Sequence, residues 1–171
     1  EVEGIAVTTG PGLEGSLLVG VSTAKALAAA MGKPIIGVQH VEAHVYANFL
    51  GREDLEPPVL CLVASGGHSD LIAMREHCRY ELVAATRDDA AGEALDKVGR
   101  LLGLPYPAGP HIDRLAREGD RERIRFPRAR LGNSLDFSFS GLKTAAYRYI
   151  TRLSPEEMEA QKADLCASFQ E

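Results

Sequence analysis

The chain has 171 residues, of which 45% are hydrophobic and 25% charged, a composition typical of a globular protein with a packed core. Its formal net charge of −5 gives no overall sign of a nucleic-acid-binding protein. Cys61, Cys78 and Cys166 form no CxxC pair, which argues against a metal knuckle or a disulfide framework. No apolar run is long enough to span a membrane, and we expect reduced thiols in a cytoplasmic protein.

Alternating apolar strands and amphipathic helices predict an α/β fold. We predict strands at 4–9, 34–38, 59–64, 69–74 and 80–84. We predict helices at 15–31, 41–50, 91–102, 111–118 and 140–153, with another that begins after the cap residue Ser154. The last helical pattern is still open at Glu171, and the sequence starts without a methionine, so we expect a piece of a longer protein.

The segment GPGLEG, which begins at Gly10, has the G-x-G-x-x-G spacing of dinucleotide-binding folds. Such folds place an acidic residue at the end of the next strand, whereas here that strand ends in Gln39 and His40. No Lys-Ser/Thr pair follows Gly15, which also excludes a P-loop. We therefore interpret the glycines as a tight turn with close packing of helix on strand.

Two histidines, His40 and His44, lie four residues apart just after an apolar strand. On a helix this spacing brings both imidazoles to one face, as two ligands of one metal ion require. A zinc protease would need its glutamate directly after the first histidine, but Glu42 lies about 200° around the helix from His40. The pair therefore predicts a metal site and not a protease, and no third ligand is evident in this chain.

A second group of candidate residues surrounds the segment Ser65-Gly66-Gly67-His68, which joins two predicted strands. A Gly-Gly turn lets backbone N–H groups approach an anion closely, although an ordinary two-glycine hairpin would have the same sequence. Strand–turn–strand phosphate loops are typical of the actin, hexokinase and Hsp70 type of nucleotide-binding protein.

Asp96 follows on a predicted helix, one turn after Gly92, where its carboxylate could accept hydrogen bonds from a ribose. The alternative is a solvated helix face, because Glu93–Lys97 and Asp96–Arg100 have the i, i+4 spacing of ion pairs. The loop that begins at Pro105 contains three prolines and a glycine, and it either wraps a flat ring or serves as a connector.

Five segments, "TTGPGLEGSLLVG", "QHVEAH", "ASGGHSDL", "DDAAGEALDKVGRLLGLPYPAGP" and "DFSFSGLKTA", occur in this order across nearly the whole chain. Together they resemble the tRNA N6-adenosine threonylcarbamoyltransferase family, in particular its bacterial branch, once labelled O-sialoglycoprotein endopeptidases. The resemblance implies the actin/hexokinase/Hsp70-type (ASKHA) nucleotide-binding fold, present as part of a two-lobed protein. Residues 1–58 would belong to the first lobe and residues 59–171 to the second.

The resemblance also implies a reaction. The family transfers a threonylcarbamoyl group from threonylcarbamoyl-adenylate to N6 of the adenosine 3′ of the anticodon, in tRNAs that read codons beginning with A, and releases AMP. His40 and His44 match its metal ligands, and the ion would be iron(2+) or zinc. An aspartate beyond Glu171 would be the third ligand. The matched substrate-binding residues are Val63, Ala64, Ser65, Gly66, Gly67, Asp96, Gly109 and Asp113.

The partners implied are tRNA, a non-catalytic paralogue of the same fold and a small ATPase, with no membrane. No general base is assigned, and His68 is either that base or a turn residue. Two alternatives stay open: a carbamoyltransferase module that acts on another acceptor, and a non-catalytic paralogue, against which the paired histidines argue. This chain alone is expected to be inactive. For tRNA contact we expect the segment 121–130, with its five arginines, unless Glu118, Asp120 and Glu122 pair with them.

Overall fold

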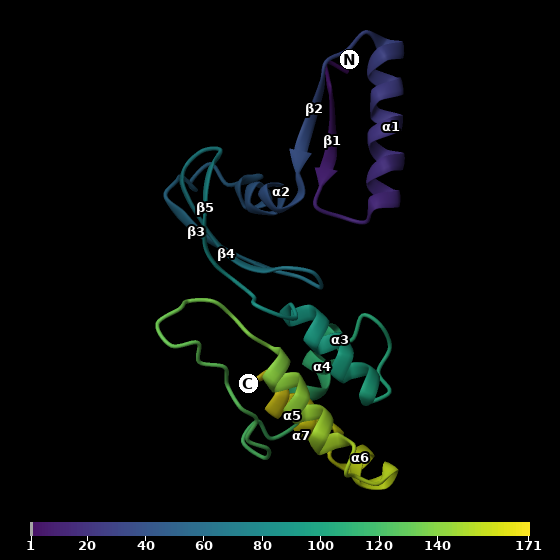
Figure 1. The fold of residues 1–171 in the computed structure, drawn as a ribbon, viewed down its shortest axis with the longest axis vertical. Coiled ribbons are helices and arrows are strands. Elements are labelled where there is room, and N and C mark those ends of the chain that lie inside the picture. Colours follow the sequence, from purple (N-terminus) through teal and green to yellow (C-terminus); the bar gives the residue numbers. More distant parts are fainter. Residues whose placement is uncertain (1) are drawn as a thin grey trace. The chain divides into compact units, whose positions relative to one another are not determined.

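The computed structural model describes residues 2–171, which divide into two compact units (Figure 1). Unit 1 comprises residues 1–61 and 74–80, and unit 2 comprises residues 62–73 and 81–171. The elements are helices together with two small sheets, as the predicted α/β class requires. Within residues 2–171, no helix combines the length and the apolar character that crossing a membrane demands.

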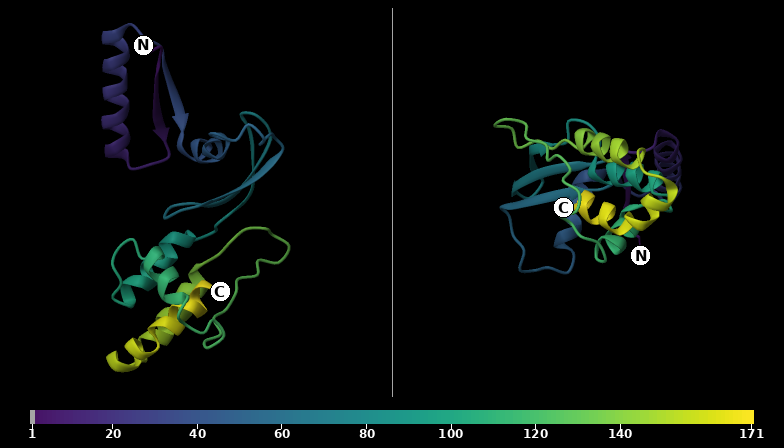
Figure 2. Two further views of the ribbon diagram at one scale, coloured as in Figure 1. Left: turned by 180° about the vertical axis from the view of Figure 1, so that it is seen from behind. Right: turned by 90° about the horizontal axis from the view of Figure 1, so that it is seen from below.

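Unit 1 begins with a strand–helix–strand arrangement. Strands β1 (Ile5–Gly10) and β2 (Ile35–Gln39) pair in parallel, and α1 (Glu14–Met31) connects them. Figures 1 and 2 show α1 running alongside the two strands. Gly32 ends the helix with φ of 60° and donates its N–H to the carbonyls of Ala28 and Ala29, so the predicted end of the helix at residue 31 is confirmed.

The glycine-rich turn between β1 and α1 is partly as predicted. Gly10 has φ of 152°, a conformation that side chains other than glycine's rarely adopt, which confirms the tight turn. Helix α1 packs on β1, but Gly15 is not the point of close approach, because a Cβ added there would meet no atom within 4 Å. The close approach lies at Gly37 on β2, where an added Cβ would come 2.8 Å from the Thr9 side chain.

Helix α2 (His40–Tyr46) begins one residue before the predicted start and continues as the short 3-10 helix η1 (Ala47–Phe49). Its first turn is capped by Gln39, whose side-chain oxygen accepts a hydrogen bond of 2.9 Å from Glu42 N. Val41 and Val45 are buried, at the same i, i+4 spacing as the histidines. Both histidines therefore lie within the helix, as their spacing requires.

A three-stranded sheet follows, with the order β3 (Val59–Ala64), β4 (Ser69–Glu76) and β5 (Arg79–Ala85). Short turns join the consecutive strands. The turn between β3 and β4 confirms the hairpin that the sequence predicts around the two glycines, and β4 and β5 form a second hairpin. In the first turn, Ser65 N donates a hydrogen bond of 2.8 Å to the carbonyl of His68.

The remainder of unit 2 is helical: α3 (Ala91–Leu101), α4 (Gly109–Ala116), α5 (Ser140–Ile150), α6 (Pro155–Ala160) and α7 (Lys162–Gln170). Helix α4 starts two residues before its predicted position. A capping box begins α6 as expected, because Ser154 Oγ accepts from Glu157 N and a Glu157 carboxylate oxygen accepts from Ser154 N. The chain breaks helical geometry at Gln161, which separates α6 from α7.

These helices share one apolar core. Its most deeply buried side chains come from α3, α4, α5 and α7, together with three residues that lie between α3 and α5 but outside the helices: Leu102, Ala108 and Ile124. Gly99 lets α3 and α4 approach closely, because a Cβ at this position would lie 2.1 Å from the Ala108 side chain. The buried members are Ala94, Val98, Leu102, Ala108, Ile112, Ile124, Ala146, Ile150, Leu165, Cys166 and Phe169.

Candidate functional site

The two histidines of unit 1 face each other across one turn of α2. Their Nε2 atoms lie 3.2 Å apart, and their ring centroids are separated by 4.5 Å. His44 is exposed and His40 is half-buried. The sequence prediction that both imidazoles lie on one helix face is therefore confirmed in geometry.

This arrangement fits two ligands of one metal ion. Two nitrogens bound to one tetrahedral zinc at 2.0–2.1 Å lie about 3.3 Å apart, close to the spacing of this pair. The same spacing suits a hydrogen bond from one ring N–H to the other ring nitrogen. Among residues 2–171, no group of three His, Cys, Asp or Glu side chains is arranged to hold a metal ion.

The Gly-Gly turn of unit 2 is held by the side chain of Ser65. Ser65 Oγ accepts hydrogen bonds from His68 N at 3.1 Å and from Gly67 N at 3.4 Å. In the described part of the chain, Gly66 N makes no hydrogen bond to the backbone. An anion at this turn would therefore find the Gly66 amide ready to donate and would compete with Ser65 Oγ for the Gly67 amide.

Helix α3 begins directly against this turn. Gly92 N donates a hydrogen bond of 3.2 Å to the Ser65 carbonyl, and Ala91 N donates one of 2.9 Å to Ser69 Oγ. A Cβ at Gly92 would lie 2.6 Å from the Ser65 carbonyl oxygen and 2.8 Å from Gly66 Cα. Glycine at position 92 is thus what allows the first turn of α3 to reach the hairpin.

A pocket of about 380 Å³ opens beside this junction. Its lining includes Gly66 from the turn and Asp96 from the next turn of α3, two residues that the sequence assigned to one site. Asp96 Oδ1 accepts a hydrogen bond of 2.7 Å from Ala108 N, which fixes the loop after α3. Asp96 and Arg100 form no ion pair in the described residues, so that part of the solvated-face alternative is wrong.

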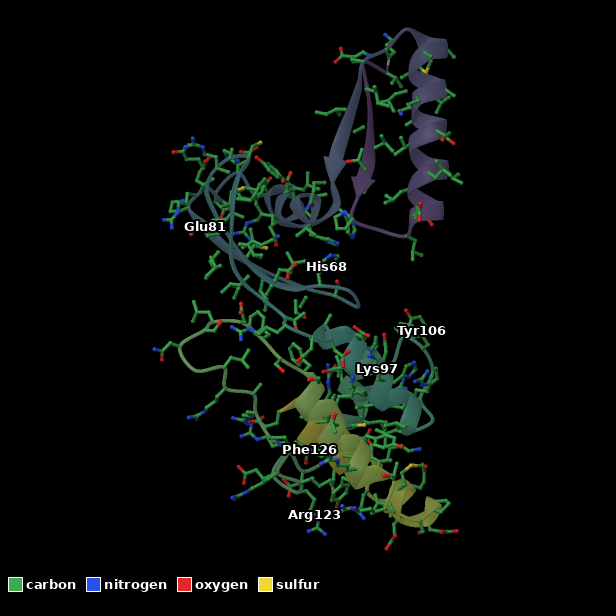
Figure 3. The ribbon with its side chains drawn as sticks, viewed as in Figure 1. His68, Glu81, Lys97, Tyr106, Arg123 and Phe126 are labelled. Carbon is green, nitrogen blue, oxygen red and sulfur yellow. The ribbon has the colours of Figure 1, made fainter. Side chains whose placement is uncertain are left out.

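Nine of the described residues line this pocket, and sequence reasoning assigned only Gly66 and Asp96 to a site; those that it missed include Lys97, Arg100 and Tyr106. Tyr106 is 84% exposed, although it is a large aromatic side chain. Figure 3 shows Tyr106 on the loop after α3, with Lys97 on the helix beside it. The prolines and glycine of this loop are compatible with either a ring-binding loop or a connector. The exposed tyrosine within the loop is the more specific sign of a binding site for a flat ring.

Six of the eight expected substrate residues do not line this pocket: Val63 and Ala64 lie on β3, Ser65 and Gly67 in the turn, and Gly109 and Asp113 on α4. Gly109 begins α4 beside the Leu95 side chain, and neither it nor Asp113 lines the pocket. The Asp113 carboxylate accepts hydrogen bonds from Gln170 at 3.0 Å and from Arg117 at 2.7 Å. These two donors hold the pKa of Asp113 below its usual value, with Gln170 the larger cause. Asp113 therefore links α4 to α7 in this structure.

Positive charge at the pocket is balanced by carboxylates. Lys97 Nζ contacts Asp89 at 2.8 Å and Glu93 at 2.7 Å, and Lys143 pairs with the other oxygen of Asp89. The hydrogen bonds to Asp89 and then to Glu93 raise the pKa of Lys97, which keeps it charged at neutral pH. The predicted Glu93–Lys97 pair is thus confirmed, within a larger network that also reaches α5.

Asp88, next to Asp89, holds the start of α5. Its carboxylate accepts hydrogen bonds from Ser138 Oγ at 2.6 Å, Phe139 N at 2.8 Å, and Ser140 N and Oγ at 3.1 and 2.9 Å. Desolvation would raise the pKa of Asp88, but these donors together outweigh it and hold that pKa far below its usual value. The Asp88 carboxylate therefore caps the N-terminus of α5, although Asp88 lies 50 residues before Ser138 in the sequence.

Comparison with known proteins adds to this geometry. The family described as "TsaD: tRNA N6-adenosine threonylcarbamoyltransferase" matches residues 1–171. Proteins named tRNA N6-adenosine threonylcarbamoyltransferase from Clostridium botulinum (strain Hall) and Clostridium perfringens (strain SM101) are 53% and 52% identical over 171 residues. The protein of that name from Clostridium kluyveri is 51% identical over 172 residues. Each match covers 99% of this chain and 50% of the relative, so the chain spans about half the length of these relatives. The chain belongs to the tRNA N6-adenosine threonylcarbamoyltransferase family.

Proposed function

We propose that the protein transfers a threonylcarbamoyl group from threonylcarbamoyl-adenylate to N6 of the adenosine 3′ of the anticodon, in tRNAs that read codons beginning with A. The observation that carries this proposal is the match of the family to residues 1–171, supported by relatives about half identical to the chain. The geometry supports it because Gly66 and Asp96, two of the expected substrate residues, line one pocket.

The chemistry needs no nucleophilic side chain, since the carbamoyl carbon of the mixed anhydride is already activated. The N6 amine attacks that carbon, the bond from carbon to phosphate oxygen breaks, and AMP leaves with the bonding electrons. One proton is lost from the attacking nitrogen. The protein's task is to position the two reactants and to stabilise the charge that collects on the phosphate.

The residues of unit 2 suit that task. The Gly66 amide is placed to donate toward the phosphate, and the Gly67 amide can join it by leaving Ser65 Oγ. The second carboxylate oxygen of Asp96 accepts from the ribose while the first holds Ala108 N. The exposed ring of Tyr106 offers a flat surface for the adenine. Lys97 pairs with the carboxylates of Asp89 and Glu93, and its positive charge offsets part of their negative charge beside the pocket.

The residues of unit 1 suit a metal centre. His40 and His44 would hold one iron(2+) or zinc ion, whose bound form supplies Lewis acidity toward oxygen atoms of the substrate. In the longer protein we place this chain within an actin/hexokinase/Hsp70-type fold of two lobes. Its partners are tRNA, a non-catalytic paralogue and a small ATPase, and the reaction takes place in the cytoplasm.

The adenylate site is tested by replacing Asp96 with Asn in the full-length protein. The amide keeps an acceptor for Ala108 N but loses the charged acceptor for the ribose, so affinity for AMP should fall by about 1.5–3 kcal/mol in calorimetry. The matched control is Glu118→Gln, which removes one exposed carboxylate that does not line the pocket. Equal affinities for the wild type and Asp96→Asn would remove Asp96 from the site.

The acceptor is tested separately. The full-length protein with its partners should modify a tRNA that carries adenosine 3′ of the anticodon, and guanosine at this position should abolish the product. Equal modification of both tRNAs, or modification of neither, would overturn the proposed reaction. The second result would favour an acceptor other than tRNA or a non-catalytic role.

A further inference from the structure

In the arginine-rich segment of unit 2, residues 121–130, buried and half-buried apolar side chains alternate with exposed arginines. This segment contains no helix or strand. Ile124 is buried in the apolar core, and Phe126 packs against the same core. Arg123, before Ile124, and Arg125, between Ile124 and Phe126, are both exposed. Figure 3 shows Arg123 on the outer side of the segment and Phe126 against the helices. The apolar side chains therefore anchor the segment and present the arginines to solvent.

Hydrogen bonds fix the backbone of this segment onto α7. Ile124 N donates to Ser168 Oγ at 3.1 Å, and the same hydroxyl donates to the Asp120 carbonyl at 3.2 Å. Asp120 N in turn donates to Asp164 Oδ1 at 2.8 Å. The Phe126 ring packs edge-on against Phe169, with centroids 6.3 Å apart. Such anchoring reduces the conformational entropy that a ligand would have to remove on binding.

The arginines fall into two groups by their partners. Arg121 and Arg128 both approach the Glu171 carboxylate, at 3.6 and 2.8 Å. Within residues 2–171, the remaining three, Arg123, Arg125 and Arg130, form no ion pair.

The nearby acids do not neutralise them. Asp120 Oδ1 accepts from Glu122 N, and in the described residues Glu118 and Glu122 form no ion pair with this segment. The alternative of pairing with nearby acids is wrong, and three guanidiniums remain uncompensated on a chain whose net charge is −5.

A pocket of about 670 Å³ lies within unit 2, and of the three unpaired arginines Arg125 lines it. The lining also includes the Arg121 and Arg128 side chains, the aromatic rings of Phe126 and Phe139, and the carboxylates of Glu122, Asp136 and Glu171. Guanidinium groups next to aromatic surface are what unpaired RNA requires, because the cations bind phosphate and both groups stack on bases. An acidic protein surface would use the charges but would have no need of the aromatic lining.

We propose that this segment binds the unpaired nucleotides of the tRNA anticodon loop, an assignment that rests on the proposed function. Arg123, Arg125 and Arg130 bind phosphates, and the pocket receives one unstacked base. Because the chain has a net charge of −5, the rest of its surface repels a polyanion such as RNA. RNA would therefore bind at the face that carries these arginines.

The test replaces Arg123, Arg125 and Arg130 with Gln in the full-length protein and measures the affinity for an isolated anticodon stem-loop over a salt series. Each single-strand phosphate contact contributes about 0.7 to the slope of log affinity against log salt, so losing three should reduce the slope by about 2. The charge-matched control replaces Arg114, Arg148 and Arg152, which are exposed and do not line the pocket. It should change the slope much less.

A second variant tests the same surface independently, in case the triple variant does not fold. Ala129 is exposed at the pocket, and Ala129→Glu places a carboxylate there that should weaken stem-loop binding, whereas Ala160→Glu on α6 should not. A duplex with the same number of phosphates but no loop should bind less tightly to the wild type. Equal loss for duplex and stem-loop would show a general polyanion site and overturn the assignment to unpaired RNA.

The outcomes separate this inference from the proposed function. Unchanged slopes in the triple variant, with transfer to tRNA intact in the wild type, would overturn the inference and leave the reaction standing. Reduced slopes with no transfer by the wild type and its partners would support the RNA-binding surface and overturn the reaction. Binding of an acidic peptide with the same loss in the triple variant would identify a protein partner instead and reject the RNA assignment.

Discussion

The amide of Gly92 donates a hydrogen bond of 3.2 Å to the carbonyl oxygen of Ser65, and this contact joins the first turn of α3 to the Gly-Gly hairpin. It brings backbone donors of the turn and a carboxylate of the helix to one pocket. Position 92 has no room for a side chain, since the atoms a Cβ would meet belong to the backbone and cannot rotate away.

Gly92→Ala should therefore destabilise the protein, by about 1–3 kcal/mol in the free energy of unfolding, the usual cost of overpacking. The hairpin would shift, so affinity for AMP should fall as well. Chemical denaturation and calorimetry measure the two effects. Gly141→Ala on α5 is the matched control, because an added Cβ there meets nothing within 4 Å and alanine favours the helix. Equal stability of Gly92→Ala and Gly141→Ala would contradict the close approach.

Asp88 should make stability depend on pH. Its pKa is lower in the folded protein than the unfolded value of about 3.9, so its contribution is complete above about pH 5. That contribution is lost as the pH falls through the unfolded value toward the lower folded one. Asp88→Ala should cost about 1 kcal/mol at pH 7, as the loss of a helix cap does, and clearly less at pH 3.

Denaturant midpoints of the wild type and Asp88→Ala at the two pH values measure this difference. Glu53→Ala is the control, because Glu53 is exposed and has no hydrogen-bond or ion-pair partner among residues 2–171. A stability difference for Asp88→Ala that stays constant between pH 7 and pH 3 would refute the charged-cap interpretation.

His40 and His44 should be required for metal binding by the full-length protein. Replacing both with Ala should lower the bound iron or zinc from about one ion per chain to a small fraction of that, because two ligands of one ion are lost. Elemental analysis after dialysis gives the stoichiometry. His77→Ala is the control, since His77 contacts Tyr46 and Glu56 rather than the histidine pair. Retention of the wild-type metal content in the double variant would end the metal hypothesis.

The three cysteines should differ in their reactivity toward a thiol-alkylating reagent. Burial raises the pKa of the Cys166 thiol to about 11, so at pH 8 about one in a thousand is ionised, and its side chain is also inaccessible. Cys78 is exposed at the β4–β5 turn and should react first. Mass spectrometry of timed samples, with Cys78→Ser as control, follows the order. Alkylation of Cys166 in the native protein as fast as Cys78 would contradict the packing of α7.

Much of the fold follows from local sequence patterns. Gly32 ends α1 and Ser154 begins α6 where capping rules place them, and the spacing of His40 and His44 predicts their common face. These features depend on residues within four positions of one another, so sequence alone can specify them.

The remainder depends on contacts between distant residues. Asp113 hydrogen-bonds to Gln170, 57 residues away, and its spacing after Gly109 carries no sign of that partner. Glu171 binds Arg128 from 43 positions away, whereas among residues 2–171 the acids next to Arg123 and Arg125 form no ion pair with them. The glycine motif likewise does not show which of its glycines packs closely, because close approach depends on how the helix is placed over the strand.

The adjacent carboxylates of Asp88 and Asp89 point to different helices. Asp88 grips the leading end of α5, and Asp89 reaches Lys97 on α3 and Lys143 on α5. This one dipeptide therefore ties the chain after β5 to α3 and to α5. We expect α3, which carries Asp96, to keep its position relative to the start of α5 when unit 2 moves.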